Sequence, residues 1–205
     1  LGAIQPGMHK NRVRQELITQ WGQEVLEQSQ NHDAEYIPLP EYPRPQMVRD
    51  DYEILNGWWE YRFGRASEWD AKKVCFHQAD GKILVPFSPE TKLSGVERQL
   101  QPEESLWYRR TFQIMLDEQQ KWEAAERDSR YILHFGAVDQ SCRIFINQRL
   151  AAEHVGGYLP IDVDITEFVQ PGMNQLHVCC LDVSDTSLHA IGKQRLHNSG
   201  MFYTA

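Results

Sequence analysis

The chain has 205 residues, of which 41% are hydrophobic and 24% are charged, and this suits one globular domain or one domain with an appended arm. No run approaches the roughly 20 apolar residues of a membrane-spanning helix, and residues 1–9 show no basic segment leading into an apolar stretch. The 21 Lys and Arg against 29 Asp and Glu give a formal charge of −8, which repels phosphate backbones and anionic lipid. We therefore expect no membrane span, no export signal, and neither nucleic acid nor a membrane as a partner.

The first forty residues predict an N-terminal arm, residues 1–40, ahead of a domain over residues 41–205. Apolar residues recur there at every fourth position among Gln, Glu and Arg, as on one stripe of an amphipathic helix, although Gly22 interrupts the pattern. The alternative is an arm that packs Trp21 and little else. Four prolines between residues 38 and 45 then predict an extended segment, either a linker or a wrapping strand. The stripe consists of Val13, Leu17, Trp21 and Val25.

From Tyr52 onward the hydrophobic period changes to two and the segments shorten. In residues 159–165 apolar side chains alternate with Pro160, Asp162 and Asp164, so one strand face is expected to be buried and the other solvated. Many short strands with little helix between them predict an all-β, antiparallel sandwich and disfavour a parallel βαβ fold. Further strands are expected near Gly57–Phe63, Lys82–Val85, Trp107–Ile114, Tyr131–Ala137, Cys142–Asn147, Leu150–His154 and Gln175–Asp182, with turns at Asp80-Gly81, Asn147-Gln148, Gly156-Gly157 and Pro171-Gly172, and one short helix over Leu116–Asp128.

The four cysteines show no Cys-x-x-Cys spacing, and Cys179 and Cys180 would point to opposite faces of a strand. A structural zinc site is therefore not expected, and Cys75, Cys142, Cys179 and Cys180 are interpreted as free thiols. Free thiols and the absence of an Asn-x-Ser/Thr sequon suit a reducing compartment, so a cytoplasmic location is expected.

Catalytic signatures are missing from the sequence. It holds no G-x-S-x-G, H-E-x-x-H, G-x-x-x-x-G-K-[ST] or G-x-G-x-x-G motif, so a self-contained hydrolase, metalloprotease or nucleotide enzyme is not expected. Histidines 134, 154 and 177 fall on separate predicted strands, and we interpret them as structural or surface residues ahead of metal ligands. Asp162 and Asp164 share one strand face, which would suit acid/base work or a cation, but a solvated face is the favoured interpretation.

Aromatic residues are more numerous than two sheet faces must bury, and flat rings beside short polar groups are how proteins hold sugar rings. Trp58, Trp107 and Phe112 are expected in the core. Phe202 and Tyr203 are better candidates for a ligand edge, because they follow a polar irregular stretch, Ser184–Gly200.

A set of motifs is spread in order over residues 39–205. The motifs are Tyr42-Pro43-Arg44-Pro45, Leu55-Asn56-Gly57-Trp58-Trp59, Val85-Pro86-Phe87-Ser88-Pro89-Glu90, Trp107-Tyr108-Arg109-Arg110, His134-Phe135-Gly136-Ala137, His154-Val155-Gly156-Gly157-Tyr158, Pro171-Gly172-Met173-Asn174 and Asp182-Val183-Ser184-Asp185-Thr186. Together they resemble the amino-terminal domain of glycoside hydrolase family 2, the family of β-galactosidases, β-glucuronidases and β-mannosidases, and are similar in pattern to its β-galactosidase-like branch.

The resemblance implies a jelly-roll, galactose-binding-like sandwich that normally precedes an immunoglobulin-like domain and a catalytic TIM barrel. The family's acid/base glutamate follows an asparagine, whereas no Asn-Glu dipeptide occurs here, and about 250 residues of barrel do not fit. No catalytic residue is therefore expected in this chain. It is expected to be an inactive fragment, without the family's closing strand, of a retaining β-glycosidase whose catalysis lies downstream. The alternative is a free-standing carbohydrate-binding or protein-interaction module without hydrolysis.

The resemblance also nominates two loops, Pro86–Gly95 and Asp182–Tyr203, as the rim of a substrate site. No metal and no cofactor is expected in this chain, and the resemblance leaves open whether the parent enzyme uses a cation. The implied partners are carbohydrate, bound weakly, the downstream domains, and further copies of the chain, since relatives are often dimers or tetramers. Asp185 would accept hydrogen bonds from sugar hydroxyls, with a local turn cap as the alternative. The other rim candidates are Lys193 and Gln194 as donors, Phe202 and Tyr203 as an apolar wall, and Phe87 and Glu90 on the first loop.

Overall fold

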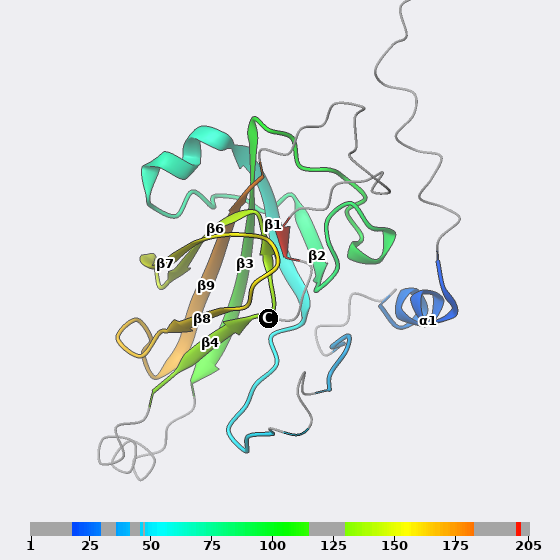
Figure 1. Ribbon diagram of the computed structural model, residues 1–205, viewed down its shortest axis with the longest axis horizontal. Coiled ribbons are helices and arrows are strands. Elements are labelled where there is room, and N and C mark those ends of the chain that lie inside the picture. The colour runs from blue at the N-terminus through cyan, green and yellow to red at the C-terminus, as the bar shows by residue number, and fades with distance from the viewer. Residues whose placement is uncertain are drawn as a thin grey trace, which may run out of the picture.

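The computed structural model describes residues 18–29, 36–41, 46, 48–114, 130–182 and 200–201 (Figure 1). Strands dominate these residues, and every strand pairing among them is antiparallel, which confirms the predicted all-β sandwich. None of the described helices is long and apolar enough to cross a membrane. The elements are α1 (Gln20–Ser29), β1 (Gly57–Arg65), the 3₁₀ helix η2 (Ala66–Ala71), β2 (Gly81–Val85), the 3₁₀ helix η3 (Lys92–Ser94), β3 (Glu104–Ile114), β4 (Ile132–Phe135), β5 (Val138–Asp139), β6 (Ser141–Ile146), β7 (Arg149–Val155), β8 (Ile161–Asp164), β9 (Gly172–Leu181) and β10 (Gly200–Met201).

A six-stranded sheet in the order β2-β1-β3-β9-β6-β7 carries the fold, and two-stranded pairs, β4-β8 and β5-β10, accompany it. The long strands β3 and β9 pair along ten residues at its centre (Figure 1). The main core lies between one face of this sheet and the β4-β8 pair, where residues such as Leu106, Ile144 and Val178 meet Phe135 and Val163. We call this side of the large sheet its inner face.

The period-two pattern of residues 159–165 is confirmed for most positions. Ile161, Val163 and Ile165 are buried, and the aspartates between them are exposed. Leu159 was expected on the buried face, but it is 64% exposed because the strand begins only at Ile161 and Leu159 belongs to the preceding loop.

The opposite, outer face of the large sheet is also covered. Phe76, Trp107, Phe145 and Cys179 form a second buried cluster there, and Trp69 packs against it. Residues 66–80, which connect β1 to β2, supply Trp69 and Phe76. Coverage of both faces explains why consecutive residues of β6 and of the end of β9 are buried, Arg143 included, instead of every second one.

The cysteines divide between these two faces. Cys180 and its cross-strand neighbour Cys142 lie in the inner core, whereas the adjacent Cys179 lies in the outer cluster, as expected for consecutive strand residues. All four cysteines are free, and Cys75 alone is partly exposed. Burial raises the pKa of the Cys142 thiol to about 12, so this thiol stays protonated at neutral pH.

The arm contains helix α1, but the helix does not pack as its sequence pattern predicted. Trp21 is 75% exposed, whereas Gly22 is buried and faces η3, where an added Cβ would lie 3.7 Å from Leu93 Cδ2. The expectation that Trp21 packs on the domain is therefore wrong, because the contact depends on close backbone approach at the glycine. Val13 and Leu17 of the predicted stripe, and the helix expected over Leu116–Asp128, lie outside the described residues.

The described part of the chain over residues 36–41 contacts the start of β1. The buried side chain of Asn56 donates a hydrogen bond from Nδ2 to the Pro38 carbonyl oxygen at 3.1 Å. Gly57 has a φ of 117°, and an added Cβ would lie only 3.0 Å from the Tyr36 carbonyl oxygen. The Asn56-Gly57 pair therefore holds Tyr36 and Pro38 close to the start of β1, whereas Pro43 and Pro45 lie outside the described residues.

The hairpin between β6 and β7 turns at Asn147 and Gln148, whose φ values are 49° and 71°. The side chain of Asn147 stabilises this turn, because it donates to the Phe168 carbonyl oxygen at 3.0 Å and accepts from the Gln175 amide at 2.9 Å. Gln148 is exposed and takes the left-handed conformation without comparable compensation.

Replacing Gln148 with glycine should therefore raise the free energy of unfolding by about 0.5 to 1 kcal/mol. Glycine relieves the strain of the left-handed conformation, and the greater flexibility that it gives the unfolded chain offsets only part of this stabilisation. Urea denaturation at neutral pH measures the difference. Gln148→Ala is the matched control, because alanine removes the side chain but keeps the strain, and it should give no gain. An equal gain in both variants would contradict this explanation.

Candidate functional site

Three segments that are distant in sequence meet at one junction of the described structure. Strand β10 pairs with β5, placing Gly200 opposite Asp139 and Met201 opposite Val138. The loop between β7 and β8 packs on the same place, because an added Cβ at Gly157 would lie 2.7 Å from Asp139 Cγ. The Asp139 side chain thus lies directly over Gly157, which explains the second glycine of the Gly156-Gly157 turn.

Most of the rim residues expected from the sequence cannot be placed. Asp185, Lys193, Gln194, Phe202 and Tyr203 lie outside the described residues. Phe202 and Tyr203 directly follow β10 in sequence.

The remaining two rim candidates lie on the loop that follows β2. Phe87 is half-buried and its amide donates to the Leu84 carbonyl oxygen at 3.1 Å, whereas Glu90 is only 4% exposed. The loop is held by its own hydrogen bonds, with Thr91 Oγ1 donating to the Ser88 carbonyl oxygen at 2.8 Å and Ser94 Oγ donating to the Thr91 carbonyl oxygen at 2.7 Å. Loop 86–95 therefore has a defined shape, and a role at a substrate rim stays a prediction for both residues.

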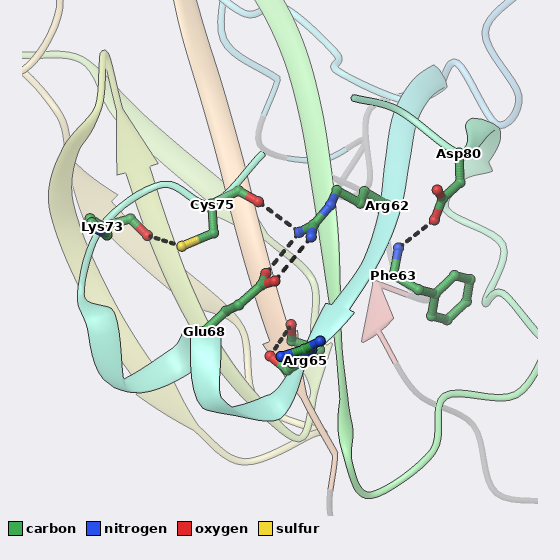
Figure 2. Close-up of polar contacts among 8 residues, drawn as sticks. Arg62, Phe63, Arg65, Glu68, Lys73, Cys75 and Asp80 are labelled. Atoms are coloured by element: carbon green, nitrogen blue, oxygen red, sulfur yellow. Dashed lines mark hydrogen bonds and ion pairs between the residues drawn. The ribbon is translucent and has the colours of Figure 1, made fainter. Parts of the chain in front are cut away.

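A charged clamp fixes residues 66–80 over the outer face (Figure 2). Arg62 on β1 donates to both carboxylate oxygens of Glu68, at 2.7 and 3.0 Å, and to the Cys75 carbonyl oxygen at 2.7 Å. The hydrogen bond from Arg62 is the main reason why the pKa of the Glu68 carboxyl is lowered. The clamp joins Glu68 and Cys75, seven residues apart on the covering segment, to one guanidinium group, and its bidentate bonds to the carboxylate suit arginine better than lysine.

Two further arginines lie against the aromatic rings of the covering segment. The Arg143 guanidinium lies 4.2 Å from the centre of the Trp69 ring and the Arg109 guanidinium 4.4 Å from that of Phe76. Glu153 neutralises Arg143 at 3.1 Å, and Glu60 neutralises Arg109 at 2.6 Å. The outer face is thus closed by its own chain. Sequence reasoning missed this set, although arginines on apolar strands were a signal for it.

His177 lies beneath the same cover. It is 1% exposed, and its ring centre lies 5.7 Å from that of Phe76. Desolvation lowers the pKa of His177 to about 4, with a smaller contribution from the Arg109 charge, so the imidazole is neutral at pH 7.

The other two strand histidines lie elsewhere. On the exposed face of the β4-β8 pair, His134 Nδ1 lies 2.6 Å from Asp162 Oδ1. On β7, His154 Nε2 lies 3.2 Å from the Gly156 carbonyl oxygen. Among the described residues, no three His, Cys, Asp or Glu side chains are grouped so that they would hold a metal ion. Asp164 accepts hydrogen bonds from Thr166, which lower the pKa of its carboxyl, so Asp162 and Asp164 have separate partners instead of working as a pair.

Comparison with known proteins places the domain in a family. Residues 52–204 match the model described as "Glycosyl hydrolases family 2, sugar binding domain". The chain therefore belongs to glycosyl hydrolase family 2, of whose proteins it carries the sugar-binding domain.

The relatives differ in the sugar that their names specify. The chain is 27% identical to a β-glucuronidase of Felis catus over 140 residues, which are 64% of the chain and 20% of the relative. It is 33% identical to a β-glucuronidase of Chlorocebus aethiops over 67% of the chain and 21% of the relative. A β-galactosidase of Thermoanaerobacter pseudethanolicus is 33% identical over 66 residues, which are 32% of the chain and 8% of the relative.

The chain thus spans about a fifth of the length of these β-glucuronidases. A crystal structure of Ruminococcus gnavus β-glucuronidase has a TM-score of 0.51 at 22% identity, covering 72% of this chain and 24% of that one, and it supports the fold. The comparisons support the family, but they do not confirm the β-galactosidase-like branch that the motifs suggested.

Glu68→Gln should lower the free energy of unfolding by about 2 kcal/mol at pH 7, because the carboxylate that binds Arg62 is lost. A lowered folded-state pKa means that this stabilisation is complete above the ordinary pKa of glutamate and is lost as the pH falls through the lowered value. The difference from the native chain should therefore disappear in acid. Denaturant titrations at several pH values measure it. Glu103→Gln, at an exposed glutamate, is the control, and an equal effect there would argue against the clamp.

The neutral imidazole of His177 should make the domain sensitive to acid. Its pKa is about 4 when folded against an ordinary value of 6.5, so between these values the unfolded chain binds a proton that the folded chain does not. The free energy of unfolding should fall by about 3 kcal/mol across this window. His177→Phe should lack this loss, and the difference between the two proteins should consequently change with pH. A difference that stays constant from pH 7 to 4 would show that His177 is not responsible.

Proposed function

We propose that this chain is the non-catalytic sugar-binding domain of a retaining β-glycosidase, and that the catalytic carboxylates belong to another part of the longer protein. The match of residues 52–204 to the sugar-binding domain of family 2 carries this proposal. The chain covers about a fifth of the length of its β-glucuronidase relatives, so most of their length has no counterpart in this sequence. This share also supports the proposal.

We further propose that the parent protein acts on β-glucuronides in preference to the β-galactosides that the motifs suggested. Two of the relatives that match about two thirds of this chain are named β-glucuronidases, whereas the β-galactosidase matches about a third. The names of relatives support a substrate class for the whole protein, and this domain would contribute to recognition through the ends of its strands.

The part that this domain plays would be to hold loops at the edge of a catalytic site. Loop 86–95 is fixed by its own hydrogen bonds, and β10, which precedes Phe202 and Tyr203 in sequence, pairs with β5. A rim of this kind gives most binding energy only together with the residues of a catalytic domain, because sugar hydroxyls need several directed partners at once. Weak binding by the isolated chain is therefore expected.

The test compares the protein in which this domain naturally occurs with the 205-residue chain. Chromogenic β-D-glucuronide, β-D-galactoside and β-D-mannoside are the substrates. The longer protein should hydrolyse the β-glucuronide with the highest kcat/KM and retain the anomeric configuration, and the isolated chain should show no turnover. Turnover by the isolated chain that a point substitution abolishes would overturn the non-catalytic role. A higher kcat/KM for the β-galactoside would overturn the proposed substrate class.

A further inference from the structure

Residues 66–80, which we call the cover, are joined to the sheet by backbone hydrogen bonds at their two ends. The Ala66 amide donates to the Glu103 carbonyl oxygen at 2.8 Å, and the Asp80 amide donates to the Tyr61 carbonyl oxygen at 2.8 Å. No described hydrogen bond between backbone groups joins the stretch between these ends to a strand. The cover can therefore separate from the sheet as a loop attached at both ends, without breaking the pairing of any two strands.

Three arginines of the sheet hold the middle of the cover, and each of their contacts involves a positive charge. Arginine contacts of this kind weaken when a further cation is placed beside them in a buried space, because the like charges repel each other. The closed position of the cover is thus sensitive to any new positive charge beneath it. The contacts are those of Arg62 with Glu68 and the Cys75 carbonyl oxygen (Figure 2), of Arg143 with the Trp69 ring, and of Arg109 with the Phe76 ring.

His177 is a group beneath the cover that can gain such a charge. It is 1% exposed and lies on the outer face of β9, in register with Arg109 on β3 and Phe145 on β6. Its Nδ1 has no hydrogen-bond partner among the described residues. The cover contributes Phe76, whose ring centre lies 5.7 Å from that of the imidazole. An imidazolium ion, which donates from both nitrogens, would lack a partner for Nδ1 here, whereas water would supply one if the cover opened.

The charged groups around His177 do not favour its protonation while the cover is closed. Burial gives the imidazole a pKa of about 4, with the Arg109 charge acting in the same direction and the Glu60 charge opposing it. Glu60 is already paired with Arg109, and the neighbours Phe145 and Phe76 carry no charge. The other ionisable side chains of the cover, apart from Glu68 in the clamp and the partly exposed Cys75, are exposed: Asp70, Lys72, Lys73, His77 and Asp80.

From this arrangement we propose that the cover is an acid-sensitive device: protonation of His177 releases residues 66–80 from the outer face while the six-stranded sheet stays folded. The open state exposes the apolar cluster of Trp107, Phe145 and Cys179 to water. An exposed histidine has a pKa of 6.5, so between this value and about 4 the open state binds a proton that the closed state does not. Opening therefore becomes more favourable as the pH falls. The inference concerns the domain itself and does not depend on the proposed function.

The thiol of Cys179 reports the opening of the cover. It is fully buried in the outer cluster, whereas Cys142 and Cys180 lie in the inner core and become accessible only when the sheet itself unfolds. The 205-residue chain carries Cys75→Ser to remove the partly exposed thiol, and it is treated with a low concentration of N-ethylmaleimide from pH 7 to 4.5. Tandem mass spectrometry identifies the alkylated cysteine. Each rate is divided by that of the same cysteine in the urea-unfolded chain at the same pH.

The normalised rate of Cys179 should rise roughly 50-fold from pH 7 to pH 4.5, because the opening equilibrium follows the difference between the two pKa values of His177. At each pH Cys179 should react at least about tenfold faster than Cys142 and Cys180, since opening the cover leaves the inner core closed.

Three variants in the same background make the test specific. His177→Phe removes the titrating group and should reduce the rise of the Cys179 rate to less than about threefold. His177→Gln is a second variant without a titrating ring, and it should flatten the pH profile whatever it does to the rate at pH 7. His77→Gln is the matched control, because this histidine lies next to Phe76 but is exposed with the cover closed, and it should keep the full rise. Native amide spectra show whether each variant is folded.

Several results would overturn the device. These are a normalised Cys179 rate that does not change with pH, no alkylation of Cys179 down to pH 4.5, or a rise that both His177 variants retain. Reaction of Cys179 no faster than that of Cys142 would also overturn it, because only global unfolding would then expose the outer cluster. None of these results depends on hydrolysis by the longer protein, so they leave the proposed function untouched.

Discussion

The large sheet is covered on both of its faces, and the rest of the structure depends on this constraint. Strands β3 and β9 pair at its centre, and β9 presents Cys180 to the inner core and Cys179 to the outer cluster. A sheet with two apolar faces is stable in water only if each face is packed against something. The β4-β8 pair covers the inner face, and residues 66–80 cover the outer one. Arginine side chains of β1, β3 and β6 fasten residues 66–80 to the sheet.

This closure limits where the domain can meet a ligand. Arg62, Arg109 and Arg143 occupy the outer face together with the rings and carboxylates that they contact, so no ligand reaches Trp107 or His177 without displacing the cover. The residues on the two faces of the sheet stabilise the fold, so a ligand would have to bind to the loops at the strand ends. Two such regions are rigid for different reasons. Loop 86–95 is bonded to itself, and the Gly156-Gly157 turn is wedged between Gln140 and Asp139.

Membership of family 2 gives these loops their proposed setting. A domain that places loops at the rim of a catalytic site needs a rigid scaffold more than it needs a high affinity for sugar. A loop displaced by about 1 Å would hold the substrate in a less reactive position. The arginine contacts and the double core supply that stiffness.

The sequence by itself determined the fold class and the strands, since alternation of apolar and polar residues is a local property, and it carried the family motifs. The left-handed turn at Asn147-Gln148 and the opposite faces of Cys179 and Cys180 were also predictable, because both follow from backbone geometry within a few residues. Only the tertiary structure decided that Gly22 and not Trp21 contacts the domain, that Leu159 is exposed, and that Arg62 binds Glu68. It also decided that Asp139 meets Gly157. Each of these features depends on how elements that are separate in sequence pack against one another. A pattern of apolar and polar residues along the chain does not specify that packing.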